Sequence, residues 1–361
     1  SRRHRKVSTA KYLYYLPVRF PSNNNIGDAR IMQYKAVKLV KRPGRFITPD
    51  LFELVTLETP ALESGQILVR QTHMSLDPAM KGWMTEDRNS YIPPVELGEV
   101  MRSSGVAEVV ESKNDQFAVG DRLVGMIGWT EYAVTNGQGL QKLPPGVDPE
   151  VVLCVLSLPG LTAYQGLIEI GKPKAGETLF VSGAAGSVGS MVGQIAKAEG
   201  LRVVGTAGTD EKCRWLEDEL GFDKAINYKA DDLFRQIKNA TPDGIDIYFE
   251  NTGGPVQHIV FSRMNVHGRI VVCGMIADYN SEKPAPGPSW INMIRRRLTM
   301  TGFAIPDHWD QVPAMTEKLL AYYQAGHLKY RAHTLHGLES AIEGINLLFT
   351  GGNTGKLMVA L

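Results

Sequence analysis

The sequence predicts an α/β protein of two structural parts, and three observations support this prediction. The chain has 361 residues, which is more than a single hydrophobic core usually organises. Hydrophobic residues make up 43% and charged residues 21%, the composition of an ordinary globular protein. Up to about residue 139 the chain reads as short strands separated by turns, whereas from Pro159 onward apolar strands alternate with helical patterns.

The first part, from Gln33 to about Gly139, predicts a partly closed β-barrel. Alternation of apolar and polar residues predicts strands at 66–72, 105–111 and 121–126. Glycine and Asn-Asp turn signals separate these strands. Many short strands with glycine and proline between them are typical of a barrel.

The second part reads as repeated strand–helix units. Apolar runs predict strands at 177–182, 202–206, 245–250, 269–273 and 298–303, and helical periodicity predicts helices at 188–199, 211–220, 231–239 and 312–324. Strands that alternate with helices of this length indicate a parallel sheet covered by helices on both faces. The tail from Lys329 to Leu361 looks mixed again, so we expect it to return to the first part.

Charge and hydropathy exclude two classes of protein. The chain carries 39 basic and 38 acidic side chains, which removes the electrostatic case for a dedicated nucleic-acid or membrane-surface binder. The longest apolar stretch runs from Val151 to Leu161, is interrupted by Ser157 and ends at Pro159-Gly160. We expect it to be too short to cross a bilayer, which takes about 20 apolar residues.

Cysteine usage indicates a reducing, cytoplasmic compartment. Only Cys154, Cys213 and Cys273 are present, and no two of them form a Cys-x-x-Cys pair. An odd number of widely spaced cysteines excludes a disulfide framework and a cysteine-rich structural zinc site.

Residues 1–31 are basic and lack the periodicity of a core element. Residues 1–30 carry seven positive charges and one negative charge, and an Arg-rich, acid-poor segment is one feature of a targeting peptide. The run Tyr12-Leu13-Tyr14-Tyr15 and the asparagine tract at 23–25 suit neither a presequence nor a folded element. We therefore interpret this segment as an extension (a tag, a targeting segment or a disordered one) with no part in the function.

A glycine-rich loop is the strongest functional motif. The strand at 177–182 runs directly into Gly183-Ala-Ala-Gly186-Ser-Val-Gly189, and a helix follows. Small residues there let the backbone turn tightly and approach a pyrophosphate, whose charge is stabilised by the N-terminus of the helix. The alternative is a turn that only permits close helix–sheet packing, but the complete strand–loop–helix–strand context favours dinucleotide binding.

The end of the next strand favours NADP over NAD. An NAD site usually carries an acid roughly 20 residues beyond the loop, where it binds the ribose 2′-hydroxyl. Here that position reads Thr206-Ala-Gly-Thr209 without an acid, and Lys212 follows as a possible partner of a 2′-phosphate. Asp210 and Glu211 are close enough in sequence to leave NAD open.

Candidate zinc ligands are missing. No histidine precedes Gly98-Glu99, and His73 lies among apolar strand residues, which is typical of a packed core histidine. Without a metal to polarise a carbonyl, alcohol oxidation is disfavoured. Hydride transfer to an alkene conjugated to a carbonyl needs only a hydrogen-bond donor for the resulting enolate.

An ordered series of segments runs from about Met32 to the carboxyl end. In this series the sequence resembles the zinc-independent medium-chain reductases, in the branch of the prostaglandin/leukotriene, alkenal double-bond and NADPH-dependent curcumin reductases. The resemblance is greatest to the bacterial curcumin reductases, through Ser90-Tyr91-Ile-Pro93-Pro94. The other matching segments are 75–80, 159–166, 183–195, 211–212, 227–228, 246–254, 273–280, 286–288 and 352–356.

The resemblance implies NADPH as the cofactor and a GroES-like β-barrel catalytic domain joined to a Rossmann domain with a doubly wound parallel sheet. The implied domains are 32–158 for the barrel, 159–327 for the NADPH-binding domain and 328–361 for the return to the barrel. It also implies a homodimer, an enone as small-molecule substrate, and no metal.

The same resemblance implies the site residues. Gly186, Ser187, Val188 and Gly189 match the pyrophosphate loop, and Lys212 and Tyr228 match the 2′-phosphate contacts. The remaining cofactor-lining positions are Asn251, Cys273, Gly274, Met275, Ile276, Tyr279, Phe303, Ala304, Ile305 and Asn353.

Two tyrosines are the catalytic candidates. Tyr279 matches the family tyrosine near the nicotinamide, where it would donate a proton or stabilise the enolate together with a ribose hydroxyl, and Tyr91 is the second candidate. A pKa near 10 favours hydrogen-bond donation over ionisation. For either residue the alternative is an aromatic ring that shapes the pocket without exchanging a proton.

Three departures from the family pattern affect the expected substrate. Ala79 and Lys81 replace the usual tyrosine and arginine, and 156–158 reads Leu-Ser-Leu where Gly-Met is usual. The leading hypothesis is NADPH-dependent reduction of the C=C bond of α,β-unsaturated ketones and aldehydes. The alternatives are a quinone oxidoreductase and an NADPH-binding protein without catalytic activity.

Overall fold

The computed structural model describes residues 32–283 and 285–361, which form two compact units. Unit 1 extends to Leu153 and includes Thr334–Leu348 and Leu357–Leu361, whereas unit 2 comprises Cys154–His333 and Phe349–Lys356. The predicted α/β class is confirmed, with a β-rich unit and a unit built on a parallel sheet. The expected extension at 1–31 lies outside the described residues.

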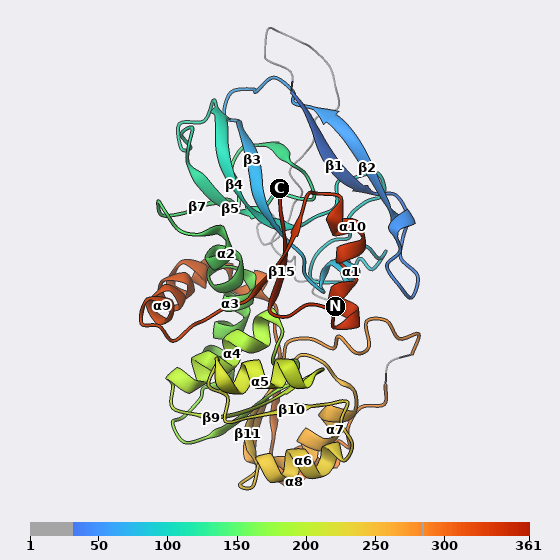
Figure 1. Ribbon diagram of the computed structural model, residues 1–361, viewed down its shortest axis with the longest axis vertical. Helices are drawn as coiled ribbons and strands as arrows, with labels where there is room; N and C mark the ends of the chain where they lie inside the picture. Colours follow the sequence, from blue (N-terminus) through green and yellow to red (C-terminus); the bar gives the residue numbers. More distant parts are fainter. Residues whose placement is uncertain (1–31, 284) are drawn as a thin grey trace, which may run out of the picture. The chain divides into compact units, whose positions relative to one another are not determined.

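Unit 1 is built from antiparallel strands (Figure 1). Two of them, β1 (Gln33–Leu39) and β2 (Phe52–Glu58), pair with each other. The larger sheet has the order β14-β15-β3-β4-β5-β7, and β6 also pairs with β3. Its strands are β3 (Ile67–Ser75), β4 (Ser104–Ser112), β5 (Arg122–Met126), β6 (Tyr132–Thr135), β7 (Gln141–Lys142), β14 (Ala332–His336) and β15 (Lys356–Ala360).

The carboxyl end of the chain completes the unit 1 sheet. Met358 of β15 lies opposite Ser75 of β3 in an antiparallel pair, so residues far apart in the sequence are neighbours in one sheet. Alternate residues of β3 and β4, including Val69 and Val109, are fully buried in a shared core, as expected for strands with one face turned inward. The short helices of this unit are η2 (Pro49–Leu51), α1 (Met80–Trp83), α2 (Pro149–Val151) and α10 (Ser340–Gly344). The chain passes into unit 2 within α11 (Leu347–Thr350).

Unit 2 has a six-stranded parallel sheet in the order β10-β9-β8-β11-β12-β13. Its strands are β8 (Thr178–Val181), β9 (Arg202–Ala207), β10 (Lys224–Asn227), β11 (Ile245–Glu250), β12 (Met264–Val272) and β13 (Thr299–Gly302). The connecting helices are α4 (Ser187–Ala198), α5 (Asp210–Asp218), α6 (Leu233–Ala240), α7 (Gly254–Arg263) and α8 (Ile291–Arg296), and η5 (Ile305–Gln311) and α9 (Val312–Gln324) follow. In Figure 1, α4 and α5 lie on one side of the sheet, and α6, α7 and α8 lie on the other.

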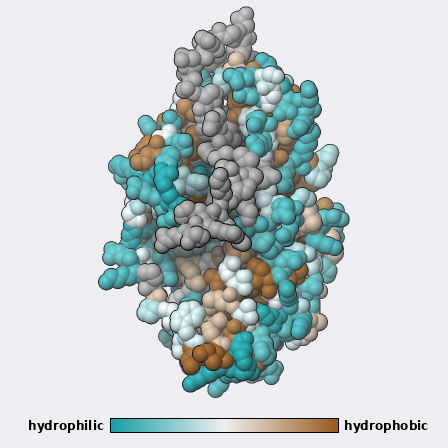
Figure 2. All heavy atoms as spheres, turned by 180° about the vertical axis from the view of Figure 1, so that it is seen from behind, coloured by the Kyte–Doolittle hydropathy of each residue, from teal (hydrophilic) through white to brown (hydrophobic). Residues whose placement is uncertain are grey.

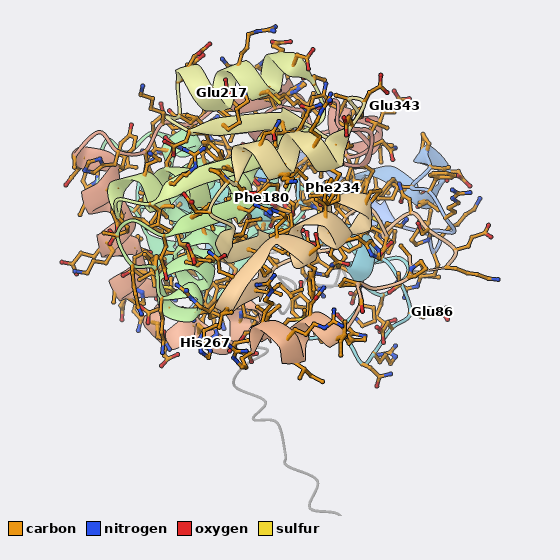
Figure 3. All side chains as sticks on the ribbon, turned by 90° about the horizontal axis from the view of Figure 1, so that it is seen from below. Glu86, Phe180, Glu217, Phe234, His267 and Glu343 are labelled. Atoms are coloured by element: carbon orange, nitrogen blue, oxygen red, sulfur yellow. The ribbon has the colours of Figure 1, made fainter. Side chains whose placement is uncertain are left out.

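The strand order reverses between β8 and β11, which is where ligands bind in open α/β sheets. Phe180 of β8 is fully buried against side chains of α6 and α7, such as Ile237 and Phe261. Figure 3 shows Phe180 inside the unit, behind the helices that cover this face. The two central strands are therefore rigidly packed, and their carboxyl ends offer a firm base for a site.

A half-buried ion pair joins strands at the start of this sheet. Arg269 on β12 donates to both carboxylate oxygens of Glu177, with N–O distances of 2.9 and 2.6 Å. It also donates to the carbonyl oxygens of Gly171 and Lys172. One side chain thereby joins β12 to the chain entering β8.

The predicted end of the apolar stretch at Pro159-Gly160 is wrong. A helical segment runs from Pro149 to Gly171 through η3 (Val152–Leu156), α3 (Leu158–Tyr164) and η4 (Gln165–Gly171), with a local break at Ser157. Pro159 lies in the first turn of α3, where its missing N–H group costs no hydrogen bond. By length and composition this segment could cross a membrane, but 72% of its most apolar window is buried inside the protein, which is typical of a core helix.

Candidate cofactor site

The predicted glycine loop leaves the carboxyl end of β8 and leads into α4. Gly183 has φ +59°, a conformation that side chains disfavour. The N–H group of Ala184 donates to the carbonyl oxygen of Thr206 at 2.8 Å, which ties the loop to the neighbouring strand β9. Gly186 caps the helix with extended backbone and no side-chain bond to the first turn. The first N–H groups of α4 are therefore left for an external acceptor.

Two glycines of the loop serve different purposes. A Cβ atom on Gly189 would lie 2.4 Å from the carbonyl oxygen of Gly183, so close packing between helix and loop requires glycine there. A Cβ atom on Gly186 would meet only that same oxygen, at 3.3 Å. The protein itself therefore hardly needs glycine at position 186. The space that a side chain would fill there suits the close approach of a pyrophosphate.

A turn near the carboxyl end borders this loop. The N–H group of Gly355 donates to the carbonyl oxygen of Ala185 at 2.9 Å, and Gly355 pairs with Gly186 in an isolated parallel bridge. Asn353 lies in the same turn, where its amide donates to the carbonyl oxygen of Gly355. Residues 353 and 186, far apart in sequence, therefore belong to one local structure within unit 2.

Lys212 lies in the first turn of α5, which follows β9, and Tyr228 directly follows the edge strand β10. The backbone N–H of Lys212 donates to Thr209, the N-cap of α5, and its Nζ donates to the carbonyl oxygen of Gly351 at 2.8 Å. Burial first, and then the positive charge of Lys229, lower the pKa of Lys212. The ring of Tyr228 covers Gly208, where an added Cβ would come within 3.2 Å of the phenol oxygen.

Of the acids near this position, Asp210 is engaged, whereas Glu211 is exposed and raises the pKa of Lys212. The strand end at Ala207-Gly208 carries no carboxylate, and the tyrosine hydroxyl lies over Gly208. Asp210 accepts a hydrogen bond from the amide of Asn227 at 2.8 Å. The Tyr228 hydroxyl over Gly208 and the positive charges of Lys212 and Lys229 favour a 2′-phosphate over a 2′-hydroxyl.

Asn251 is held by a buried network that sequence reasoning missed. Its N–H and its side-chain amide donate to the hydroxyl and carbonyl oxygens of Ser182, each at 2.8 Å. The fully buried carboxylate of Glu250 accepts hydrogen bonds from Ser182, Tyr248 and the N–H groups of Thr252 and Gly253. Glu250 thus fixes the loops that follow β8 and β11. An acid ending an apolar strand was the available signal.

The segment from Cys273 to Tyr279 follows β12 and lies against the Asn251 loop. The N–H group of Ile276 donates to the carbonyl oxygen of Asn251 at 3.2 Å, and the N–H of Met275 donates to the Tyr279 hydroxyl at 3.4 Å. Burial raises the pKa of the Cys273 thiol to about 12 and raises the pKa of Tyr279. Both groups stay protonated at neutral pH. The Tyr279 side chain is 38% exposed, so it can be reached by a substrate.

The remaining predicted cofactor residues lie in unit 2, whereas the second catalytic candidate lies in unit 1. Phe303, after β13, packs edge-on against Phe249 with ring centroids 6.5 Å apart, and Ala304 and Ile305 follow it. All predicted cofactor residues therefore lie in unit 2, at the carboxyl edge of its sheet or on the bordering turn. Tyr91 lies in unit 1, between α1 and β4, and its side chain is 51% exposed.

The cysteines and histidines do not gather into a metal site. In the described part of the chain, no group of three or more histidine, cysteine, aspartate or glutamate residues could hold a metal ion. His73 of β3 is half-buried, and burial lowers its pKa. Its side chain contacts the hydroxyl of Thr72 at 3.2 Å.

Family models match both parts of the chain. Residues 35–143 match the N-terminal domain of oxidoreductase, and residues 187–321 match the zinc-binding dehydrogenase model. A 2-alkenal reductase (NADP(+)-dependent) of Nicotiana tabacum is 41% identical over 302 residues, covering 82% of this chain and 87% of the relative. The chain belongs to the medium-chain dehydrogenase/reductase family, in the branch of the alkenal, prostaglandin and curcumin reductases.

Other members of this branch match most of the length of this chain. The NADPH-dependent curcumin reductase of Escherichia coli is 39% identical over 328 residues, with 89% of this chain and 95% of the relative covered. Prostaglandin reductase 1 of Rattus norvegicus is 40% identical over 337 residues, with 91% and 99% covered. The crystal structure of CurA from Vibrio vulnificus in complex with NADPH has a TM-score of 0.86 at 38% identity and covers 90% of this chain and 98% of its own.

Proposed function

We propose that this reductase uses NADPH to reduce the C=C bond of α,β-unsaturated ketones and aldehydes. The observation that carries the proposal is the Tyr228 hydroxyl over Gly208, at a strand end without an acid, with Lys212 in the first turn of the helix that follows. The glycine loop of the same unit has room for a pyrophosphate. Relatives named for the reduction of 2-alkenals, prostaglandins and curcumin support the reaction class.

The residues that would hold NADPH all belong to unit 2. The loop at 186–189 would take the pyrophosphate on the backbone N–H groups at the start of α4. Lys212 and Tyr228 would bind the 2′-phosphate. The nicotinamide half would lie along Asn251, 273–276, Tyr279 and 303–305, with Asn353 on the bordering turn.

Tyr279 is the proposed stabiliser of the enolate. Bound NADPH supplies the hydride that adds to the β-carbon of the conjugated alkene. The negative charge then develops on the carbonyl oxygen, which needs a hydrogen-bond donor. Tyr279 is 38% exposed, and burial raises the pKa of its hydroxyl, so the hydroxyl retains the proton that it would donate. Tyr91 is the second candidate donor, from the barrel unit.

Replacement of Tyr279 by phenylalanine tests this role. We expect kcat for a simple enone to fall by about tenfold or more, since a positioned proton donor typically contributes at least that much, while the KM for NADPH changes little. Tyr91→Phe is the parallel variant. Unchanged enone turnover by Tyr279→Phe would remove Tyr279 from the chemistry and leave it as a pocket-shaping ring.

The reaction class is tested by oxidation of NADPH and, separately, of NADH by the purified protein. The acceptors are a simple enone, curcumin and a quinone. The proposal predicts enone-dependent oxidation with strong preference for NADPH. Turnover with the quinone alone would assign quinone reduction instead, and NADPH binding without turnover of any acceptor would indicate a binding protein.

We propose the domain bounds 32–158, 159–327 and 328–361, preceded by the extension at 1–31. The changes between compact units at Leu153/Cys154 and at His333/Thr334 support a division near these positions, whereas Phe349–Lys356 lies in unit 2 and departs from the proposed return to the barrel. We further propose a cytoplasmic location, because all three cysteines are free thiols.

We propose that the reductase forms a homodimer through the β13 edge of unit 2. β13 ends the strand order, so one side of it has no strand partner among the described residues. Nearby, Trp290, Ile291 and Ile294 of the α8 segment are 61%, 44% and 74% exposed. Apolar side chains gather at the lower end of Figure 2, the end at which α8 lies in Figure 1. A mass by light scattering of twice 39.7 kDa is expected, and a monomer would contradict the proposal.

A further inference from the structure

Lys229 is an exposed lysine whose side chain is held in place. It follows Tyr228 directly, in the turn after β10, and its N–H group donates to the side-chain oxygen of Asn227 at 3.0 Å. Its Nζ lies over the Tyr228 ring, 5.7 Å from the ring centroid. An ammonium group over an aromatic face is attracted by the ring. The charge of Lys229 is therefore kept beside the Tyr228 ring.

The ammonium groups of Lys229 and Lys212 belong to different elements but interact electrostatically. The charge of Lys229 contributes to the lowered pKa of Lys212, which places the two cations in one electrostatic environment. Within residues 32–283 and 285–361, neither lysine forms an ion pair with a carboxylate. Other lysines of unit 2 do so: Lys197 pairs with Asp223 and Lys224 with Glu217.

The two cations repel each other, which is unfavourable for the protein alone, although the Glu211 carboxylate offsets part of this effect at Lys212. A dianionic phosphate would relieve the remaining repulsion and would accept bonds from both ammonium groups and from the Tyr228 hydroxyl. We propose that Lys229 is a specificity-determining residue that supplies the second positive charge for the 2′-phosphate of the cofactor. This inference rests on the proposed use of NADPH and adds a residue to it that the resemblance did not supply.

The inference is tested with two probes that differ only in the 2′-phosphate, adenosine 2′,5′-bisphosphate and 5′-AMP. Their dissociation constants are measured by titration calorimetry for the complete chain and for Lys229→Gln. We expect the bisphosphate to bind about fivefold to tenfold more weakly to the variant, as for the loss of one partly exposed charge-assisted contact, and 5′-AMP to bind equally.

Two further variants serve as controls. Lys229→Arg keeps the charge and should bind the bisphosphate within about twofold of the parent chain, although the geometry of the two cations differs. Lys238→Gln removes an exposed lysine from α6 of the same unit. It should leave both dissociation constants unchanged, because Lys238 is not among the charges that shift the pKa of Lys212.

Three results would overturn the inference: an unchanged bisphosphate affinity in Lys229→Gln, an equal loss for 5′-AMP, or an equal loss in Lys238→Gln. Failure of the proposed function would look different. A chain that turns over no enone but loses bisphosphate affinity in Lys229→Gln would contradict the reaction and keep the role of Lys229.

Discussion

At the residue scale, Gly186 and Gly189 separate what the fold requires from what a ligand requires. Both lie in one loop and both are glycine, yet only Gly189 has backbone atoms within 3 Å of the position that a Cβ would take. Sequence reasoning could find the motif but could not separate these reasons. The distinction depends on the distance between the loop and α4, which no spacing of glycines reveals.

Replacement of each glycine by alanine tests this separation. We expect Gly186→Ala to cost about 1 kcal/mol or less of unfolding free energy while raising the KM for NADPH and for NADH at least tenfold. Gly189→Ala should destabilise the protein by about 1–3 kcal/mol, as for overpacking. Thermal unfolding and steady-state kinetics measure the two effects. If Gly186→Ala binds both cofactors normally, the loop only permits close packing between helix and sheet and does not bind the pyrophosphate.

Lys212 gives the cofactor preference a pH dependence. Its pKa is lowered by burial and by Lys229, so it loses its proton at a lower pH than an ordinary lysine, whose pKa is about 10.4. We expect the preference for NADPH over NADH to decline as the pH is raised from 7 toward about 10. In Lys212→Arg the guanidinium stays charged, so the preference should persist. A decline of the same size in both proteins would assign it to another group.

At the element scale, the strands and helices of unit 2 follow from their apolar periodicity. The predicted strand at 245–250 and helix at 312–324 have the bounds of β11 and α9. The long helical segment at 149–171 was not foreseen, because Pro159 and Gly160 read as an end when Pro159 in fact opens a new helical turn. Glu250 was missed for a related reason. Its importance comes from bonds to Ser182 and Tyr248 that only the paired strands bring close.

The Arg269–Glu177 pair is expected to stabilise the sheet of unit 2. Both side chains are about one-fifth exposed, at 20% and 18%, and charge-assisted bonds of this kind contribute about 1.5–3 kcal/mol. We expect Arg269→Ala to lower the free energy of unfolding by about 2–3 kcal/mol in urea titration. The control is Arg70→Ala, which removes the more exposed pair with Glu108 and should cost less than about 1 kcal/mol. If both variants lost the same free energy of unfolding, the less exposed Arg269–Glu177 pair would contribute no more to stability than the exposed pair.

At the scale of the whole molecule, the chain combines a β-rich unit that contains its own carboxyl-terminal strand with a parallel-sheet unit that carries every predicted cofactor residue. The change near Pro159, from short strands with turns to alternating strands and helices, predicted two parts. The position of the exchange between units could not be foreseen, because one helical segment runs through Leu153 and Cys154 without a turn signal. Substrate choice could not be predicted, because Ala79 and Lys81 depart from the family pattern that would have indicated it.

The most direct measurement is reduction of a simple enone with NADPH that carries deuterium as the transferred hydrogen. The product is analysed by NMR and mass spectrometry. Our account predicts a saturated ketone with deuterium on the former β-carbon and a proton from water on the α-carbon. An allylic alcohol with deuterium on the carbonyl carbon would contradict it, because the hydride would then have reduced the carbonyl group and left the C=C bond intact.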